Sequence, residues 1–297
     1  MRNIDEHTIT PAFMERLANC ENPRLKEIMT SLVKHLHDFA REVRLTEAEW
    51  LAAIEFLTAT GQKCSDTRQE FILLSDTLGL SMLTVALNQD KPAGATEATV
   101  FGPFHVADAP PAEQGADIAR DAPGEPLFVQ ARVRSLAGAP IAGAEVDIWQ
   151  ADDDGLYDVQ RPELGSARRA RALMHTDSAG SVRFRTIAPT AYPVPTDGPV
   201  GQMLLATGRH PWRPAHIHFM IRAAGFAPLI THIFVDGDKY LDSDVVFGVR
   251  SSLIGNFVRH AAGTAPDGTR MTQPFQVLQQ DFVLAPLAAS LLPARAA

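Results

Sequence analysis

The sequence predicts an α+β protein in which a helical N-terminal region is followed by a region of short β-strands. Up to about residue 95, apolar residues recur with the three- and four-residue spacing of helices. Residues 103–126 then include five prolines, which favours ordered loop over regular structure. After this segment, apolar and polar residues alternate as they do in half-buried strands. We therefore predict a helical domain over residues 1–95 and a β domain over residues 96–297.

The first two helices have recognisable starts. Pro23 is tolerated at the first position of a helix. It precedes a run that lies on one helical face, namely Leu25, Ile28, Met29, Leu32, Val33, Leu36, Phe39, Ala40 and Val43. Thr46 and Glu49 have the spacing of a capping box, so a second helix is expected to start there and to end near Gly61.

Two further helical segments complete the N-terminal region. One is expected to start at Asp66 and to run through residues 71–74, and the other covers residues 81–88. The last segment is too apolar for an isolated surface helix. We therefore expect the helical region to bury much of itself or to pack against a partner.

The β region contains several short strands with turn residues between them. The strands are expected at residues 129–134, 145–149, 182–186, 215–222 and 229–235. No long helical crossover separates them, and parallel neighbours would need one. An antiparallel sandwich or barrel is therefore predicted.

Composition narrows the class of protein. The 297 residues are 45% apolar and 21% charged, which excludes a disordered chain, and the net charge of −8 argues against binding to nucleic acid or an anionic membrane. No apolar run approaches the roughly 20 residues that span a bilayer. The two cysteines exclude a disulfide framework. A cytoplasmic protein without a membrane segment is expected.

The sharpest chemical signal is the pair His216 and His218. On a strand, residues two apart point to the same face, so both imidazoles can reach one metal ion. The alternative is two histidines on an exposed sheet surface. A cupin would need a glutamate where Arg222 and Ala223 stand. A barrel hydrolase would place this motif on its first strand, so both of those families are disfavoured.

A two-histidine site needs further ligands, and two of the three tyrosines precede the pair in marked contexts. Tyr157 follows Asp-Asp-Asp-Gly-Leu, and Tyr192 precedes Pro-Val-Pro-Thr-Asp-Gly-Pro. A packed, half-buried tyrosine is the commoner fate of the residue. Because a free phenol has a pKa of about 10, a tyrosinate ligand implies a strongly charged cation such as ferric iron.

These residues resemble the ligand set of the intradiol ring-cleavage dioxygenases. The matching segments are residues 149–157, 192–201, 213–218 and 236–242, with 70–79 and 100–104 in the front half. The resemblance implies an antiparallel β-sandwich catalytic domain that holds one non-haem Fe(III) per subunit. Its implied metal ligands are Tyr157, Tyr192, His216 and His218. It also implies a homodimer through the N-terminal helices, with a phospholipid bound at that interface.

The resemblance also implies the chemistry. An aromatic diol would bind as a dianion and displace Tyr192, which then acts as an internal base. Arg213 would stabilise negative charge on the ring; the alternative for this residue is a surface ion pair. Reaction with O₂ would open the ring between the two hydroxyls. From hydroxyquinol (1,2,4-trihydroxybenzene) this gives 3-hydroxy-cis,cis-muconate or maleylacetate, in the catabolism of aromatic compounds.

The pocket residues suggest which diol is cleaved. By match to the family, the pocket is lined by Leu73, Asp76, Val100, Phe101, Gly102, Pro103, Phe104, Val194, Pro195, Arg213, His232 and Val246. Asp76 and His232 are polar, and a buried third hydroxyl needs a polar partner. This favours hydroxyquinol over catechol or chlorocatechols, which stay as alternatives. A non-catalytic, transthyretin-like binding module is a more distant one.

Overall fold

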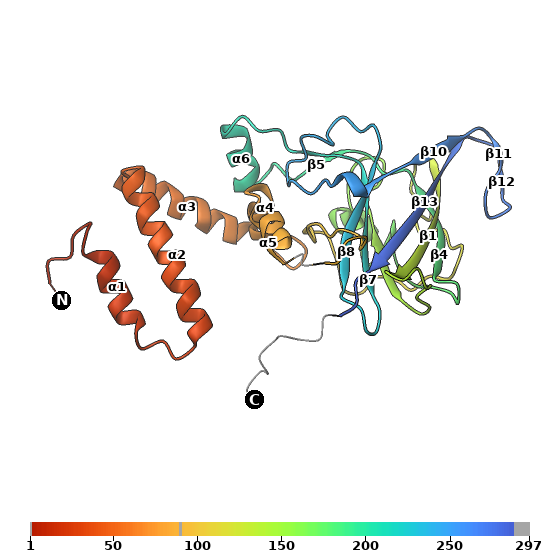
Figure 1. Ribbon diagram of the computed structural model, residues 1–297. Coiled ribbons are helices and arrows are strands. Elements are labelled where there is room, and N and C mark those ends of the chain that lie inside the picture. Colours follow the sequence, from red (N-terminus) through yellow and green to blue (C-terminus); the bar gives the residue numbers. More distant parts are fainter. Residues whose placement is uncertain (1, 89–90, 288–297) are drawn as a thin grey trace. The chain divides into compact units, whose positions relative to one another are not determined.

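A computed structural model of the chain describes residues 2–88 and 91–287 (Figure 1). The chain divides into two compact units, residues 1–59 and residues 60–297. The boundary proposed at residue 95 on the basis of sequence stays a prediction. Each unit is described by itself below.

The first unit is helical. It contains α1 (Ile9–Leu17), α2 (Pro23–Glu42) and most of α3 (Glu47–Lys63). The predicted start of α2 is confirmed: Pro23 is its first residue, and the Asn22 side chain caps it by accepting the Leu25 N–H at 3.0 Å. The apolar face of α2 is about half exposed within this chain, as at Leu36 with 54%. The helix α1, which is only nine residues long, was not predicted from the sequence.

The capping box of α3 is confirmed, but its predicted end is wrong. Thr46 accepts the Glu49 N–H at 3.3 Å, and Glu49 accepts the Thr46 N–H at 2.9 Å. The helix passes Gly61 and ends at Lys63. Gly61 does not adopt the left-handed conformation that would stop a helix.

The second unit begins with short helices. These are α4 (Glu70–Thr77) and α5 (Leu80–Leu87), with α6 (Pro199–Ala206) later in the chain. The predicted start of α4 at Asp66 is wrong, because Ser65 and Arg68 close a tight turn through their backbone groups before the helix begins. In the part of the chain that the structure describes, no single helix is long and apolar enough to cross a membrane. The bent pair α4 and α5 meets that test only when its two helices are joined across a 73° bend.

The β-strands form two larger sheets. The first has the order β10 (Phe257–His260), β13 (Phe275–Leu284), β1 (Pro126–Ser135) and β4 (Ser181–Ile187). The second has the order β3 (Arg171–His175), β2 (Glu145–Trp149), β7 (His216–Arg222), β8 (Leu229–Val235) and β9 (Ile254–Gly255). The pairs β1–β13 and β8–β9 are parallel, and the other neighbours are antiparallel. These sheets lie in the right-hand part of Figure 1.

Small elements complete this unit. Two two-stranded ribbons pair β5 (Tyr192–Pro193) with β6 (Trp212–Arg213) and β11 (Gly263–Thr264) with β12 (Arg270–Met271). Short 3₁₀ helices are η1 (Asp158–Gln160), η2 (Pro162–Leu164) and η3 (Ser251–Leu253).

The core lies between the two large sheets, which confirms the predicted α+β fold with a β-sandwich. The prediction of a purely antiparallel sandwich is wrong, because β1–β13 and β8–β9 pair in parallel. The first sheet contributes Leu127, Val129, Ala131, Val133, Val182, Phe184, Leu278 and Phe282. The second contributes Val146, Ile148, Ala172, Met174, Ile217, Phe219, Ile221 and Ile233. Burial of such side chains is the main stabilising term, about 1.5–3 kcal/mol for each large one. The side chains on the opposite face of the second sheet do not belong to this core, so they can form a functional site.

Candidate metal centre

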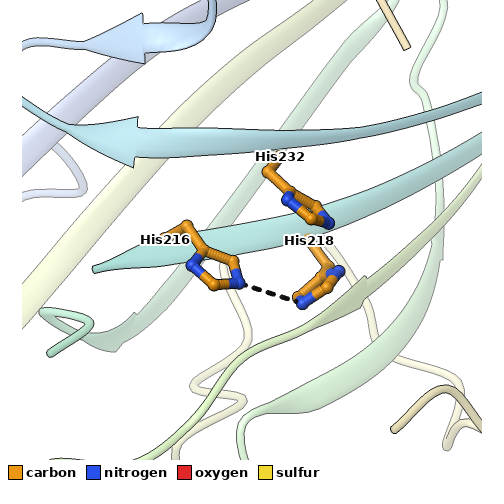
Figure 2. A group of neighbouring side chains, drawn as sticks. All are labelled: His216, His218 and His232. Carbon is orange, nitrogen blue, oxygen red and sulfur yellow. Dashed lines mark hydrogen bonds between the residues drawn. The ribbon is translucent and has the colours of Figure 1, made fainter. Parts of the chain in front are cut away.

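A row of aromatic and basic side chains crosses the outer face of the second sheet. His218 of β7 lies opposite Trp149 of β2 and His232 of β8, and Trp149 lies opposite Arg171 of β3. Residues paired across strands point to the same face. His216 lies two residues before His218, so it joins the same face. Figure 2 shows the three imidazoles drawn together from β7 and β8.

Four donor atoms converge at this row, and they belong to the four residues that the resemblance implied as metal ligands. Tyr157 Oη lies 3.0 Å from Tyr192 Oη and 2.9 Å from His218 Nε2. His216 Nε2 lies 3.1 Å from His218 Nε2 and 3.4 Å from Tyr192 Oη. The four atoms thus form a closed ring. All four side chains are at least 97% buried, so the alternative of an exposed histidine pair is wrong.

This ring of donors fits a metal ion. Nitrogen and oxygen ligands that bind one ion at about 2.0–2.2 Å lie about 2.8–3.6 Å from one another, which matches the observed separations. His216 Nδ1 lies 2.6 Å from the Pro214 carbonyl, which only a protonated Nδ1 can satisfy. Its Nε2 therefore directs a lone pair into the ring. Such an outer hydrogen bond is typical of metal-binding histidines.

The two phenols of the site can ionise only beside a strong positive charge. Burial raises the pKa of the Tyr157 phenol well above its ordinary value, and the neighbouring Tyr192 adds to that rise, against the charges of Arg213 and Arg171. Burial also raises the pKa of the Tyr192 phenol. Phenolate ligands here would need a highly charged cation beside them.

The histidines are already in the state that a metal requires. Burial lowers the pKa of the His216 imidazole well below its usual range, and the charge of Arg213 lowers it further. Burial and the neighbouring His232 and His216 do the same for His218. Both rings are neutral at pH 7, so they can coordinate without first losing a proton.

Packing holds the four side chains in place. The Phe104 ring stacks on Tyr157 with centroids 4.5 Å apart, and the Trp149 indole stacks on His218 at 4.6 Å. Gly102 has a φ of +77° and lies so close that a Cβ there would be 3.2 Å from His218 Cε1. A Cβ at Gly155 would be 2.7 Å from Tyr192 Cβ. Both glycines thus let the backbone approach a donor residue closely.

Arg213 lies at the edge of the donor ring rather than at the surface. Its Nη1 is 3.1 Å from His216 Nε2, and its Nη2 is 3.3 Å from His232 Nδ1. Asp244 holds the guanidinium with both oxygens, at 3.1 and 3.2 Å. Burial opposes the charge of Arg213, but Asp244 and the nearby phenols keep its pKa above the usual value. The result is a fixed cation at the centre.

His232 packs against both donor histidines, with ring centroids 4.7 Å from His216 and 4.0 Å from His218, and its Nδ1 faces Arg213. Because a guanidinium can only donate, His232 Nδ1 accepts from Arg213 and the ring proton is on Nε2. The ring nitrogens of His216, His218 and His232 are within 4.8 Å of one another. Even so, the contact with Arg213 makes His232 a neighbour of the centre and not a fifth donor. Its place in the substrate pocket stays a prediction.

Several of the predicted pocket residues lie against the centre. Gly102 and Phe104 contact His218 and Tyr157, and the Phe101 ring lies 6.0 Å from that of Trp149. Val246 lies two residues after Asp244, and its backbone N–H donates to Asp244 Oδ1 at 3.4 Å. For all of these residues the assignment to a substrate pocket stays a prediction. Leu73, Asp76, Val100 and Val194 are buried, and Pro103 and Pro195 are half-buried.

Residues that position the centre were missed from the sequence. Asp244 holds Arg213, yet no spacing in the sequence links the two. Trp149 was noted only as part of a matching segment, although its place two residues after Asp147 on a strand puts it on the site face. Arg171 and Asp158 form a buried ion pair next to Tyr157 in the chain, with Arg171 Nη2 2.7 Å from Asp158 Oδ1. Asp158 directly follows Tyr157, and this adjacency in the sequence could have indicated that Asp158 supports the tyrosine.

The fold and these donor atoms define a class of protein: a β-sandwich whose sheet face directs two phenols and two imidazoles to one point. Residues 100–286 match the family described as "Dioxygenase", and residues 22–96 match "Catechol dioxygenase N terminus". The chain belongs to the intradiol dioxygenase family. This confirms the resemblance and the prediction of an enzyme of aromatic catabolism. The family generally depends on non-haem ferric iron.

Individual relatives are similar over most of their length. The 6-chlorohydroxyquinol 1,2-dioxygenase of Cupriavidus pinatubonensis is 62% identical over 89% of this chain and 95% of the relative. The hydroxyquinol 1,2-dioxygenase of Corynebacterium glutamicum is 50% identical over 95% and 94%. The crystal structure of a hydroxyquinol 1,2-dioxygenase from Pseudomonas putida superimposes with a TM-score of 0.86 at 46% identity, covering 95% of this chain and 99% of that one.

Proposed function

We propose that the protein cleaves hydroxyquinol between its two adjacent hydroxyls with O₂, at a ferric ion held by Tyr157, Tyr192, His216 and His218. The observation that carries the proposal is the closed ring of four buried donor atoms, 2.9–3.4 Å apart. Hydroxyquinol is the proposed substrate because relatives that are 50% identical or more act on it or on its 6-chloro derivative.

The donor set indicates what the metal contributes. When bound, ferric iron would supply a charged Lewis-acidic centre that binds the diol oxygens and prepares the ring for O₂. Tyr157, Tyr192, His216 and His218 would hold it, and the buried rings of Phe104 and Trp149 pack against Tyr157 and His218.

Two residues act on the substrate. Tyr192 Oη lies in the donor ring, so it can accept the proton of a substrate hydroxyl as a general base. Arg213 directs Nη1 to the same ring and cannot lose its proton, so it stabilises negative charge that develops on the substrate. Asp244 fixes its orientation.

Oxygen uptake with a panel of diols tests the proposal. Iron-loaded protein is expected to show the red-brown absorption of ferric tyrosinate and to turn over hydroxyquinol with a higher kcat/KM than catechol or 4-chlorocatechol. A second candidate, 6-chlorohydroxyquinol, is included because of the 62% identical relative. A colourless protein that is fully active, or one active with zinc alone, would rule out the ferric centre. A preference for catechol would rule out the substrate.

Asp76 is expected to set the preference for a third hydroxyl. The side chain is 2% exposed, and burial raises its pKa to about 6, against a hydrogen bond from Ser81 and the charge of Arg213. Above that pH the carboxylate is ionised, and a hydrogen bond to it is worth about 1.5–3 kcal/mol, roughly tenfold to a hundredfold in kcat/KM. Catechol would leave the same carboxylate unpaired.

We therefore expect Asp76→Asn to reduce the ratio of kcat/KM for hydroxyquinol over catechol by about tenfold. In wild-type protein the ratio should rise as the pH increases through 6, because the raised pKa keeps the carboxyl neutral below it, and in the variant it should stay flat. Asp242→Asn removes an exposed carboxylate and serves as the control. Equal losses on both substrates would make Asp76 irrelevant to selectivity and leave His232 as the next candidate.

We also propose that residues 1–95 form a homodimer interface. The apolar side chains on one face of α2 and at its C-cap, which remain about half exposed, support this. They are Leu25, Ile28, Leu32, Leu36, Phe39 and the C-cap residue Val43. An apolar stripe of this length is typical of a helix that packs against a partner. A phospholipid bound at the same interface is a further part of the proposal.

A further inference from the structure

A buried arginine lies beside the donor ring without contributing to it. Arg171 is 2% exposed on β3 and lies opposite Trp149, whose indole stacks on His218. Its Nε and Nη2 hold the carboxylate of Asp158 at 3.1 and 2.7 Å. The same Nη2 donates to the Phe104 carbonyl at 2.8 Å. One guanidinium thus joins two segments that are far apart in the sequence.

Both of these segments contact Tyr157. Asp158 is the next residue along the chain, so its ion pair fixes the backbone from which the phenol extends. Phe104 places its ring on the face of Tyr157, 4.5 Å away and inclined by 22°. The Tyr157 N–H is also bound, to Gln160 Oε1 at 3.0 Å. Tyr157 is therefore held through its backbone and through its ring.

Tyr192 is held differently. It lies on the two-residue strand β5, which pairs with the equally short β6. Its ring meets Tyr157 edge-on and is tilted by 41° to His216. The two phenols thus differ in how firmly their surroundings hold them, although both present an oxygen to the same point.

We propose that Arg171 is a positioning residue that, through Asp158 and Phe104, fixes the direction in which the Tyr157 phenol points toward the donor ring. This inference rests on the proposed function. A buried ion pair such as Arg171–Asp158 is weak evidence for a stabilising role, because replacing such a pair by neutral side chains is often harmless. Arg171 Nη1 is moreover buried without a hydrogen-bond partner among residues 2–88 and 91–287.

The test uses a double variant that leaves no unpaired buried charge, Arg171→Met combined with Asp158→Asn. Arg169→Gln is the matched control, because Arg169 belongs to the same segment but pairs with the exposed Asp121. Iron content, the ferric–tyrosinate absorption with and without hydroxyquinol, kcat, KM and Tm are measured on full-length, iron-loaded protein.

The double variant is expected to bind iron but with a shifted and weaker tyrosinate band, and with kcat lower by about 10- to 100-fold while KM changes little. The control should match wild type. If the double variant does not fold, Arg171→Lys, which retains the charge but loses the two-pronged contact, should shift the band in the same direction. A lower Tm with an unchanged band and unchanged kcat per bound iron would overturn the inference. A wild-type protein without the band would instead overturn the proposed function itself.

Discussion

Replacing His216 by alanine is expected to deprive the protein of its iron and of its activity. His216 Nε2 is one of four converging donors, and its Nδ1 is anchored to the Pro214 carbonyl at 2.6 Å. Loss of an outer hydrogen bond to a metal ligand already costs about 10- to 100-fold in affinity, so loss of the ligand itself should exceed about 100-fold. Iron per subunit after dialysis and oxygen uptake with hydroxyquinol measure this.

The control for this variant is His175→Ala. His175 lies on β3 in the same sheet but is exposed, so its loss should change neither iron content nor turnover. Retention of stoichiometric iron and normal activity by the His216 variant would contradict the four-donor centre. Reduced Tm in both variants would point to the sheet rather than the metal.

The second large effect is expected for Tyr192→Phe. The change keeps the ring and removes the oxygen that accepts the substrate proton, and loss of a general base costs about 10²- to 10⁴-fold in rate. Iron should be retained, because Tyr192 is the less firmly held phenol, on the two-residue strand β5, and the more firmly held Tyr157 and both histidines remain. Steady-state kinetics together with iron analysis separate the loss of turnover from the loss of metal.

Two other tyrosines complete this comparison. Tyr157→Phe is expected to lower iron content and to remove most of the tyrosinate band, because Tyr157 is the more firmly held phenol. Tyr240→Phe is the control, since Tyr240 is not one of the four donors and its ring stacks on that of Trp212, with centroids 5.2 Å apart. If Tyr192→Phe turns over hydroxyquinol at the wild-type rate with iron bound, Tyr192 is not the base.

The sequence by itself determined the fold class and, through the resemblance to the family, named the candidate donor residues. Alternation with a period of two placed Ile217 and Phe219 in the core and His216 and His218 on the opposite face. This geometry is local, because it depends only on the pleat of one strand. The capping box at Thr46 was readable for the same reason. The start of α4 and the end of α3 were not, since weak local signals were overridden by a turn and by continued helix.

Only the tertiary structure decided how the centre is supported. Arg213 and Asp244 are 31 residues apart, and Arg171 and Phe104 are 67 apart, yet each pair is in direct contact. The sheet register places Arg171, Trp149, His218 and His232 in one row, and register is a property of strand pairing that no single strand encodes. Buried charges must find partners wherever the fold brings them, so the residues that hold the ligands are set by packing and not by spacing in the chain.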